Sequence, residues 1–523
     1  MHTKRFIFLL LAVASIAAMV LTACGAPQVV EKVVTVEVEK PVEVVKTVEV
    51  VQTVEVQVQA TLPPPPVGSS AQKAIDEAKQ YAGTEINVIW ESGLQPQDPL
   101  TFAPIFTELT GVKVNVIDTP FVDLYPKQLQ DHLSGGGAYD VLTFPPAWLV
   151  DFVNAGVVEP LNPYIDKYMN KADLDDYLPV YGAEGYGRIG DTWYGLPDDG
   201  DIFITYYRKD LFEDPANMEE FKAKFGYDLK APVDYKEFGE ICQFFTEKYA
   251  PEMYGCAFQH AAGQAFDWFF GPFSGNGGQF FDPATMTPGI NSEAGVKTLT
   301  QLLNATKYMP PGVNTWDFVG VLSAWMDGKV AMIVTWPPIG RWSEGVGLMT
   351  KQLSWVPPTK VAGKVGYAPE PGGRPLLAGG FNLAVSADSK NKEAAYLFIQ
   401  WMNSPEISLQ RVMLPFALRD PFRKSHFASP LYQSLWTGAP EYLDALESAA
   451  STGQFELGIP GGREYADAVD QALAAAYAGT DPQQALDEAA AKWAEITDRL
   501  GVDEQKAQYE AWLNGPWNKP GPQ

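Results

Sequence analysis

The chain has 523 residues, a formal net charge of −26 and a pI near 4.5. A surface this acidic disfavours binding to nucleic acid and to anionic ligands, and it suits an exported protein. The length also exceeds what one hydrophobic core usually supports, so we expect two lobes.

The first residues have the features of an export signal. Lys4 and Arg5 precede an apolar run over 6–20, which ends in the sequence LTACG at 21–25. A basic start, an apolar run and small residues at the end describe a secretory signal. The ending resembles a bacterial lipobox, which predicts a signal peptide over 1–23 and a lipidated Cys24. An ordinary signal with a cysteine there by chance is the alternative.

No run after Cys24 reaches the ~18 apolar residues that a membrane span requires. We therefore expect a protein at the cell surface or in the periplasm, held at the outer leaflet of the cell membrane by its lipid.

Residues 24–75 are predicted to form a low-complexity tether. Over 28–59, valine alternates with Glu, Lys, Thr and Gln, with an interruption at Pro41, and four prolines follow at 63–66. Alternation alone favours a strand, but the prolines and the lack of aromatics favour an extended spacer. About 50 residues at ~3.3 Å each could span up to ~160 Å. A self-associating β stalk is the alternative.

Strand and helix patterns then alternate along the chain, which predicts βαβ units and a mainly parallel sheet. In a later helix, Ala395, Phe398, Ile399 and Met402 fall on one face. The last third is predicted to be helical. The predicted strands are 86–90, 112–116, 139–143, 330–335 and 382–386, and the predicted helices include 103–109, 124–133, 319–326, 464–477 and 481–500.

The residues at the strand ends are candidates for a binding site, because open α/β sheets bind ligands beyond the carboxyl ends of their strands. Aromatic rings can cover the apolar faces of a sugar, while carboxylates and hydroxyls bind its hydroxyl groups. For Trp336, which two prolines follow, we expect a place in the cleft, with core packing as the alternative. The candidates at these ends are Trp90, Glu91, Ser92, Phe144, Trp336, Gly380 and Phe381.

Two cysteines remain after Cys24, and in an exported chain Cys242 and Cys256 are expected to form a disulfide. Two free buried cysteines are the alternative. His132, His260 and His426 lack metal-ligand spacing, so we predict no metal and no cofactor. Phosphate-loop and nucleophile-elbow motifs are also absent from the sequence.

One acidic cluster leaves a catalytic alternative open. Asp198, Asp199 and Asp201 lie close together, and a glycosidase needs two carboxylic acids across the scissile bond. Such clusters more often form solvated turns or accept hydrogen bonds from hydroxyls, so we expect no catalytic residue and no enzyme. The sequence GGRE at 461–464 opens a helix whose N-terminus could hold an anion or a hydroxyl.

Taken in order, several motifs resemble the extracellular solute-binding proteins of bacterial ABC importers, in the sugar-binding group that includes maltose-binding protein. Each motif is loose alone, but their order and spacing together are specific. They are GVKV at 111–114, YDV at 139–141, NAGVVEPL at 154–161, WYGLP at 193–197, YYRKDLF at 206–212, WMDGKVAM at 325–332 and GGFNLAV at 379–385.

The resemblance implies the type II fold of periplasmic binding proteins, an α/β architecture with two lobes that close about a hinge. Residues 198–204 and 377–381 match the segments that cross between the lobes, so each lobe is discontinuous in sequence. The expected lobes are 76–200 with about 376–425, and 201–375 with about 426–523 including a helical C-terminal part.

The resemblance also implies particular contacts with ligand. Phe144 matches a sugar-stacking position, Asp201 an acceptor for hydroxyls, and Trp336 lies beside another stacking position. Two departures leave the particular sugar open: the sequence PPA at 145–147 replaces a polar stretch, and WPP at 336–338 replaces the usual GPW. Further candidates are Asp267 and Trp268 near one aromatic contact, and Tyr465 and Asp467 near the last one.

We therefore expect a monomeric, lipid-anchored protein that captures a neutral carbohydrate, either a mono- or an oligosaccharide, and delivers it to an ABC permease. Its chemistry is binding and closure of the lobes. An anchored glycoside hydrolase is one alternative, and a binder of a non-sugar solute such as a polyamine, a metal complex or a phosphorylated polyol is another.

Overall fold

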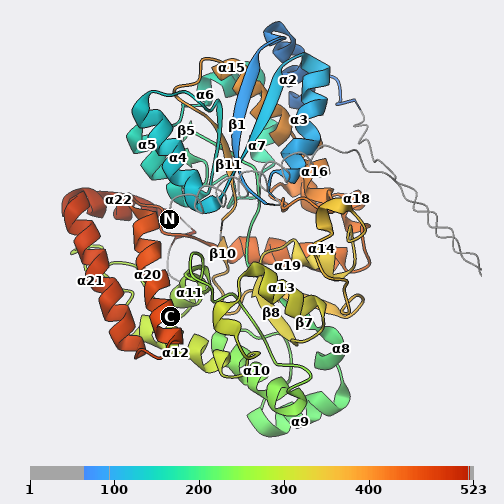
Figure 1. Ribbon diagram of the computed structural model, residues 1–523, viewed down its shortest axis with the longest axis vertical. Helices are drawn as coiled ribbons and strands as arrows, with labels where there is room; N and C mark the ends of the chain where they lie inside the picture. The colour runs from blue at the N-terminus through green and yellow to red at the C-terminus, as the bar shows by residue number, and fades with distance from the viewer. Residues whose placement is uncertain (1–63, 94, 378, 516, 519–523) are drawn as a thin grey trace, which may run out of the picture. The chain divides into compact units, whose positions relative to one another are not determined.

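The computed structural model describes residues 64–93, 95–377, 379–515 and 517–518. The predicted signal peptide, Cys24 and nearly all of the predicted tether lie outside these residues. In the described part, two β-sheets each carry their own helices (Figure 1). We call the parts around them the five-stranded lobe and the three-stranded lobe.

The five-stranded lobe contains the predicted parallel βαβ units. Its sheet has the order β2-β1-β3-β11-β6. Strands β1 (Glu85–Glu91), β2 (Lys113–Thr119) and β3 (Val141–Phe144) are parallel, and β11 (Asn382–Val385) is antiparallel to both β3 and β6 (Leu196–Pro197). The early strand predictions are therefore confirmed.

Helices α3 (Gln97–Thr110), α4 (Phe121–Ser134) and α15 (Lys392–Asn403) pack on this sheet. Every residue of α15 from Ala394 to Asn403 is buried, including the four predicted to share its apolar face.

The folded part begins earlier than the sequence indicates. Helix α2 (Ser70–Ala78) packs on α15 and buries Ser70, Ala71 and Ala74. The side chain of Ser69 caps this helix by accepting from the backbone N–H of Gln72, and Gln400 Nε2 donates to the carbonyl of Ser70 at 2.9 Å. The predicted tether boundary at 75 is therefore wrong, because a capped amphipathic helix starts at Ser70.

The three-stranded lobe has the sheet order β8-β7-β9, and both outer strands are antiparallel to β7. These strands are β7 (Ile204–Arg208), β8 (Met332–Thr335) and β9 (Val365–Pro369). The expectation of a mainly parallel sheet fails here, since the stretch that would continue it makes only single bridges, from Tyr254 to Val330 and from Ala257 to Ile333.

Helix α10 (Tyr235–Tyr249) belongs to this lobe and carries Cys242, which a disulfide joins to Cys256. Both cysteines are fully buried in the core. This is the pairing that the sequence analysis expects.

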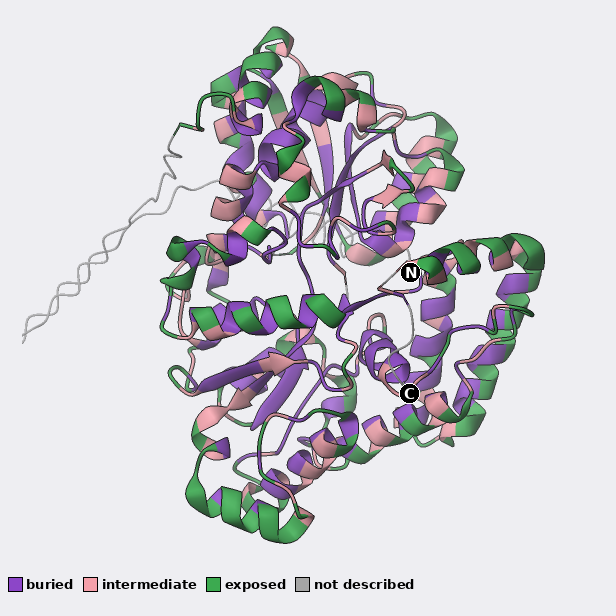
Figure 2. Ribbon diagram, turned by 180° about the vertical axis from the view of Figure 1, so that it is seen from behind, coloured by how far each residue is buried: buried purple, intermediate pink, exposed green. Residues whose placement is uncertain are grey.

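The chain crosses between the sheets where the resemblance implies. Residues 198–203 lead from β6 to β7, and residues 370–381 lead from β9 back to β11. The second crossing contains β10 (Leu376–Leu377), which pairs with β12 (Gln454–Phe455). Because both crossings are largely buried, they form part of the core (Figure 2).

Three helices close the chain: α20 (Gly462–Tyr477), α21 (Pro482–Leu500) and α22 (Val502–Asn514). The first two match the predicted C-terminal helices. Trp493 of α21 donates from Nε1 to the carbonyl of Tyr465 at 2.8 Å, which fixes α21 against α20. Among the described residues, no helix is both long and apolar enough to cross a membrane.

The remaining helices and strands are short connections or cover the two sheets. They are α5 (Leu149–Ala155), α6 (Asn162–Tyr168), α7 (Ala172–Asp175), α8 (Lys209–Phe212), α9 (Pro215–Phe225), α11 (Asp267–Gly275), α12 (Glu293–Thr306), α13 (Phe318–Met326), α14 (Ile339–Ser343), α16 (Pro405–Met413), α17 (Lys424–Phe427), α18 (Pro430–Gln433), α19 (Ala439–Thr452), β4 (Arg188–Ile189) and β5 (Thr192–Trp193).

Candidate functional site

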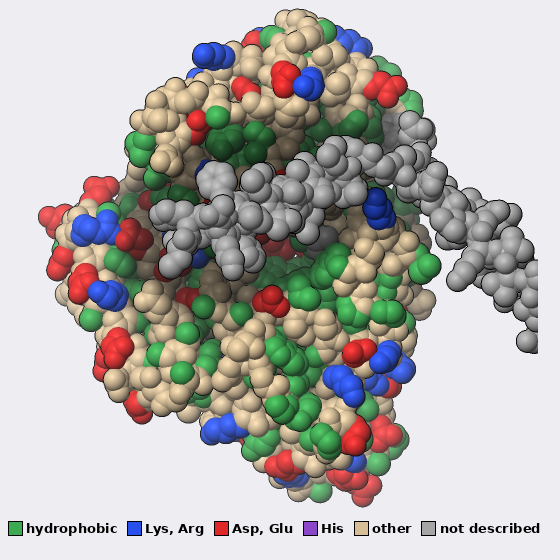
Figure 3. All heavy atoms as spheres, viewed as in Figure 1, with side chains coloured by type: hydrophobic (Ala, Val, Ile, Leu, Met, Phe, Trp, Pro, Cys, Tyr) green, Lys and Arg blue, Asp and Glu red, His purple; other side chains and the backbone are tan. Residues whose placement is uncertain are grey.

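A cavity of about 230 Å³ lies where the two lobes meet, and residues of both sheets line it. Glu91 and Ser92 reach it from the carboxyl end of β1, and Trp336 reaches it from the carboxyl end of β8. Where the view is open, this face of the molecule is hollowed and shows hydrophobic and acidic side chains in the hollow (Figure 3). A cavity of this size suits a small solute.

Aromatic side chains form much of the wall. Trp148 follows β3 in a short 3₁₀ turn and packs edge-on against Tyr125, with ring centroids 5.2 Å apart. Trp336 is partly buried and packs edge-on against Phe203 at 5.0 Å and Trp268 at 5.2 Å. These neighbours hold both indoles in place, so each presents a rigid apolar surface to the cavity. Other aromatic residues of the lining are Phe121, Phe266, Phe270, Phe318 and Phe381.

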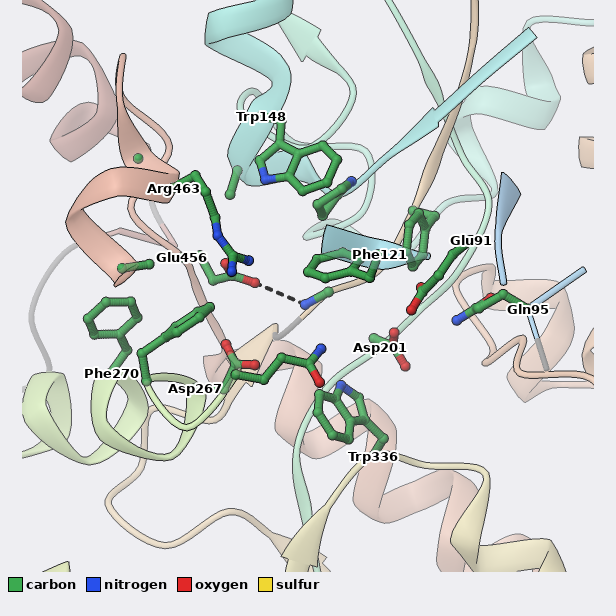
Figure 4. Close-up of a pocket in the computed structure, with 18 of the residues that line it drawn as sticks. Glu91, Gln95, Phe121, Trp148, Asp201, Asp267, Phe270, Trp336, Glu456 and Arg463 are labelled. Carbon is green, nitrogen blue, oxygen red and sulfur yellow. Dashed lines mark hydrogen bonds between the residues drawn. The ribbon is translucent and has the colours of Figure 1, made fainter. Parts of the chain in front are cut away.

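Four carboxylates line the same cavity: Glu91, Asp201, Asp267 and Glu456 (Figure 4). Burial raises the pKa of Glu91 to about 7 and the pKa of Glu456 to about 7. Burial also raises the pKa of Asp267 well above its usual range, and the neighbouring charge of Glu456 adds to that shift. Groups of this kind change protonation near neutral pH, so they can donate or accept hydrogen bonds with a hydroxylated ligand.

Arg463, in the first turn of α20, is the cationic residue of the described lining. Its Nε lies 2.8 Å from Asp467 Oδ1, and its guanidinium carbon lies 5.7 Å from the ring centroid of Phe121 and 5.8 Å from that of Phe266. The guanidinium is therefore held between an acid and two aromatic rings.

Behind the cavity lies a second set of charges, which we call the hinge layer. It consists of Asp98, Asp198, Asp199 and Asp420 with Arg341, Arg411 and Arg419, all fully buried.

Arginines hold the acids of the hinge layer by close ion pairs. Arg411 lies 2.6 Å from both Asp98 and Asp198, and Arg419 lies 2.9 Å from Asp198 and 3.1 Å from Asp199. Asp198 and Asp199 belong to the crossing segment, so these pairs fasten that segment to α16 and to the chain that follows it.

Asp201 lies between the cavity and the hinge layer. One oxygen each of Asp199, Asp201 and Asp420 lie within 4.8 Å of one another. Burial and the two neighbouring acids raise the pKa of Asp201 well above its usual range. The backbone N–H of Gly380 also donates to Asp201 Oδ2 at 3.1 Å.

Half of the candidates predicted from the sequence line this cavity. They are Glu91, Ser92, Asp201, Asp267, Trp336 and Phe381.

Three further candidates are core residues instead. Phe144 is fully buried at the end of β3 and packs edge-on against Phe152 at 5.1 Å. Trp90 is fully buried, with the guanidinium of Arg419 5.1 Å from its ring centroid. Trp268 is 1% exposed and donates from Nε1 to the carbonyl of Val334. These three side chains are packed in the core and are not in the described lining.

The other three candidates, Gly380, Tyr465 and Asp467, also lie outside the described lining. Gly380 is buried with φ +58°, and its N–H is used by Asp201. Tyr465 is fully buried and its hydroxyl bonds to Thr497 at 2.9 Å. Asp467 is half exposed and positions Arg463 by an ion pair.

Sequence reasoning missed Trp148, Glu456 and Arg463. Trp148 lies four residues beyond Phe144, at the strand end that was identified, so the region was right and the residue wrong. Arg463 lies in the GGRE helix start that was noted as a possible ligand site. Glu456 follows the two-residue strand β12, which is too short to show any periodicity.

The predicted acid cluster of Asp198, Asp199 and Asp201 is divided by the fold. Asp198 and Asp199 are paired with arginines of the hinge layer, and Asp201 alone of the three lines the cavity. The cluster therefore does not place two acids across a ligand in the way that glycoside hydrolysis requires.

A hinged α/β fold with an aromatic and acidic cavity between its lobes defines a solute-binding protein. Residues 64–408 match the bacterial extracellular solute-binding protein family, which covers more than half of the chain. The protein belongs to this family, as the sequence resemblance predicts.

Similar proteins agree with this assignment. A probable amino-acid ABC transporter periplasmic-binding protein of Sinorhizobium fredii is 29% identical over 66% of this chain and 75% of its own. The erythritol/L-threitol-binding protein of Mycolicibacterium smegmatis is 22% identical over 75% of this chain and 81% of its own.

Among solved structures, an ABC transporter solute-binding protein from Agrobacterium radiobacter in complex with ribitol superposes with a TM-score of 0.66 at 24% identity, over 79% of this chain and 99% of its own. The fold is thus the type II periplasmic-binding-protein fold that the sequence predicts.

Proposed function

We propose that this protein binds a carbohydrate or polyol in the cavity between its lobes and delivers it to an ABC permease. The observation that carries this proposal is one cavity that combines two firmly held indoles, Trp148 and Trp336, with four carboxylates. The apolar faces of a sugar or polyol stack on indoles, and its hydroxyls bond to carboxylates. The named ligands of two similar proteins, erythritol or threitol and ribitol, support the same class.

We expect the lobes to close on the ligand, because both lobes supply residues to the cavity. The five-stranded lobe supplies Glu91 and Trp148, and the three-stranded lobe supplies Trp336 and Asp267. A ligand that touches both sets favours the closed arrangement of the lobes. We take the lobes to be residues 70–200 with about 376–425, and 201–375 with about 426–523.

The proposal also covers the location of the protein and its oligomeric state. The protein acts as a monomer outside the cell membrane, held by lipid on Cys24 after removal of residues 1–23, and it catalyses no reaction. The lipobox-like end of the signal sequence supports the anchor, and the arginine-paired state of Asp198 and Asp199 supports the absence of hydrolysis.

A thermal-shift screen against sugars and polyols tests the function. A ligand at ~100 times its dissociation constant adds ~2.7 kcal/mol to the free energy of unfolding, which raises the melting temperature measurably. The ligand should also be recovered unchanged after incubation. Absence of stabilisation by every sugar and polyol, or release of reducing sugar from oligosaccharides, would contradict the proposal.

A further inference from the structure

The described lining of the cavity has an excess of negative groups. Its charged side chains are four carboxylates and one guanidinium, that of Arg463. Asp467 already pairs with this guanidinium at 2.8 Å. The lining therefore offers little positive charge to compensate its acids.

The surroundings do not supply the missing charge. The cation that acts on Glu91 is Arg419, which already pairs with Asp198 and Asp199. In the hinge layer as a whole, four carboxylates face three guanidiniums. Asp201 has two further acids, Asp199 and Asp420, within 4.8 Å, and the largest charge acting on Asp267 is that of Glu456.

Asp267 is the clearest case. Its side chain is only 3% exposed, lines the cavity, and has one oxygen, Oδ1, with no hydrogen-bond partner in the described part of the chain. Its charged neighbours are Glu456, Asp470 and Glu370, opposed by Arg463. In the described part of the chain, Glu456 accepts one hydrogen bond, from the backbone N–H of Gly379 at 3.0 Å (Figure 4). A buried carboxylate in such surroundings is costly unless a positive group approaches it.

The aromatic wall suits the same kind of group. Phe266, Phe270 and Trp336 line the cavity together with Asp267, and ring faces attract ammonium groups. In Figure 4 the labelled side chains of Phe270, Asp267 and Trp336 surround the same side of the cavity. A wholly neutral sugar would use these rings but would leave the acids uncompensated.

We infer that the natural ligand is a hydroxylated ammonium compound, an amino sugar or amino polyol, whose nitrogen lies beside Asp267 and Glu456. This inference rests on the proposed function and replaces only the expectation that the carbohydrate is neutral. The hydroxyl groups of the ligand contact Glu91, Ser92 and the indoles, and its ammonium group contacts the acids near α11.

Matched pairs of ligands test this by calorimetry at pH 7.5 in a buffer without amines. The pairs differ chiefly in charge: glucosamine with glucose, glucamine with sorbitol, and tris(hydroxymethyl)aminomethane with pentaerythritol. At least one amine should bind tenfold or more tightly than its neutral counterpart. N-acetylglucosamine, which keeps the nitrogen but removes its charge, should lose that advantage.

Variants locate the effect. Asp267→Asn should weaken the amine tenfold or more and leave the neutral counterpart within about threefold, and Glu456→Gln should act in the same direction. Asp327→Asn, at an exposed acid paired with Lys360, is the matched control and should change neither affinity.

The pH dependence gives a second signature. Affinity for the amine should rise between pH 5.5 and 7.5, because Glu456, with a pKa of about 7, must lose a proton to pair with it.

The binding results distinguish failure of this inference from failure of the proposed function. If neutral members bind as tightly as their amines, or N-acetylglucosamine binds as tightly as glucosamine, the inference is overturned and the proposed function stands. If no member of any pair binds, both are overturned. Tight binding of a polyamine without hydroxyl groups would likewise overturn both.

Discussion

The hinge layer and the cavity lining contain the same kinds of side chain in opposite electrostatic states. In the hinge layer, each of Asp98, Asp198 and Asp199 has an arginine within 3.1 Å. In the lining, Asp267 has an oxygen with no hydrogen-bond partner among the described residues, and Glu456 accepts from one described backbone N–H. The two sets are joined through Asp201. Removing one partner of a buried pair of this kind destabilises the fold, whereas an acid without a paired cation remains available to a ligand.

Removing Arg419 gives the most direct test of whether the acids of the hinge layer depend on their arginines. Arg419→Met leaves Asp198 and Asp199 buried without one of their cations, so the free energy of unfolding should fall by about 3–5 kcal/mol. Urea denaturation measures the change. Arg499→Met, at an exposed pair with Glu464, is the control and should cost less than about 1 kcal/mol. A loss of similar size in both variants would mean that the hinge layer does not depend on its arginines.

A second comparison separates a cavity tryptophan from a core tryptophan. Trp336→Ala should weaken ligand binding by about 1–3 kcal/mol, as expected for a buried aromatic anchor. Trp268→Ala, at a fully packed neighbour, should instead lower the free energy of unfolding by about 3–5 kcal/mol. Calorimetry and urea denaturation on both variants distinguish the roles. Unchanged affinity of folded Trp336→Ala protein would assign Trp336 to the core.

The pH dependence of stability tests whether the acids of the lining, unlike those of the hinge layer, lack a compensating charge. The folded-state pKa values of Glu91 and Glu456 are raised from 4.5 to about 7, so the folded protein binds more protons than the unfolded chain between these values. The ligand-free protein should therefore lose stability as the pH rises from about 4.5 to 7, by up to about 3 kcal/mol for each of the two groups. Glu91→Gln should flatten the profile measured by denaturation at several pH values. A profile that rises over this range would contradict uncompensated acids in the lining.

The smallest effect is expected for Asp267→Asn. This change replaces a buried carboxyl group whose Oδ1 has no hydrogen-bond partner among the described residues, so the free energy of unfolding should change by less than about 1 kcal/mol. Thermal denaturation without ligand measures it. A loss as large as that of Arg419→Met would show that Asp267 stabilises the fold in the same way as the hinge layer does.

The parallel strands and the main helices could be predicted because short residue patterns in the sequence identify them. Alternating residues mark β1 and β2, and the spaced apolar residues of α15 mark its buried face. The antiparallel order of β7, β8 and β9 was not predictable in this way, because pairing between distant segments leaves no local pattern.

For the site, the sequence predicted the region of the chain but not the individual residues. Residues at strand ends were correctly placed near the cavity, but the direction of each side chain depends on the turn that follows. Phe144 ends β3 pointing into the core, and the next turn brings Trp148 to the cavity instead. Asp267 and Trp268 are neighbours on α11, so one faces the cavity and the other packs on Val334. The pairing of Asp98, Asp198 and Asp199 depends on Arg411 and Arg419, which lie more than 200 positions away in the sequence.

Helix α2 has a mechanical consequence. The chain enters the folded part at Ser70, and α2 is fastened to α15 of the five-stranded lobe by buried side chains and by the bond from Gln400. Any pull transmitted along the preceding chain is therefore borne by that lobe. The three-stranded lobe is not attached to the preceding chain. An anchor on that chain would therefore restrain the five-stranded lobe and leave the three-stranded lobe free to move relative to it.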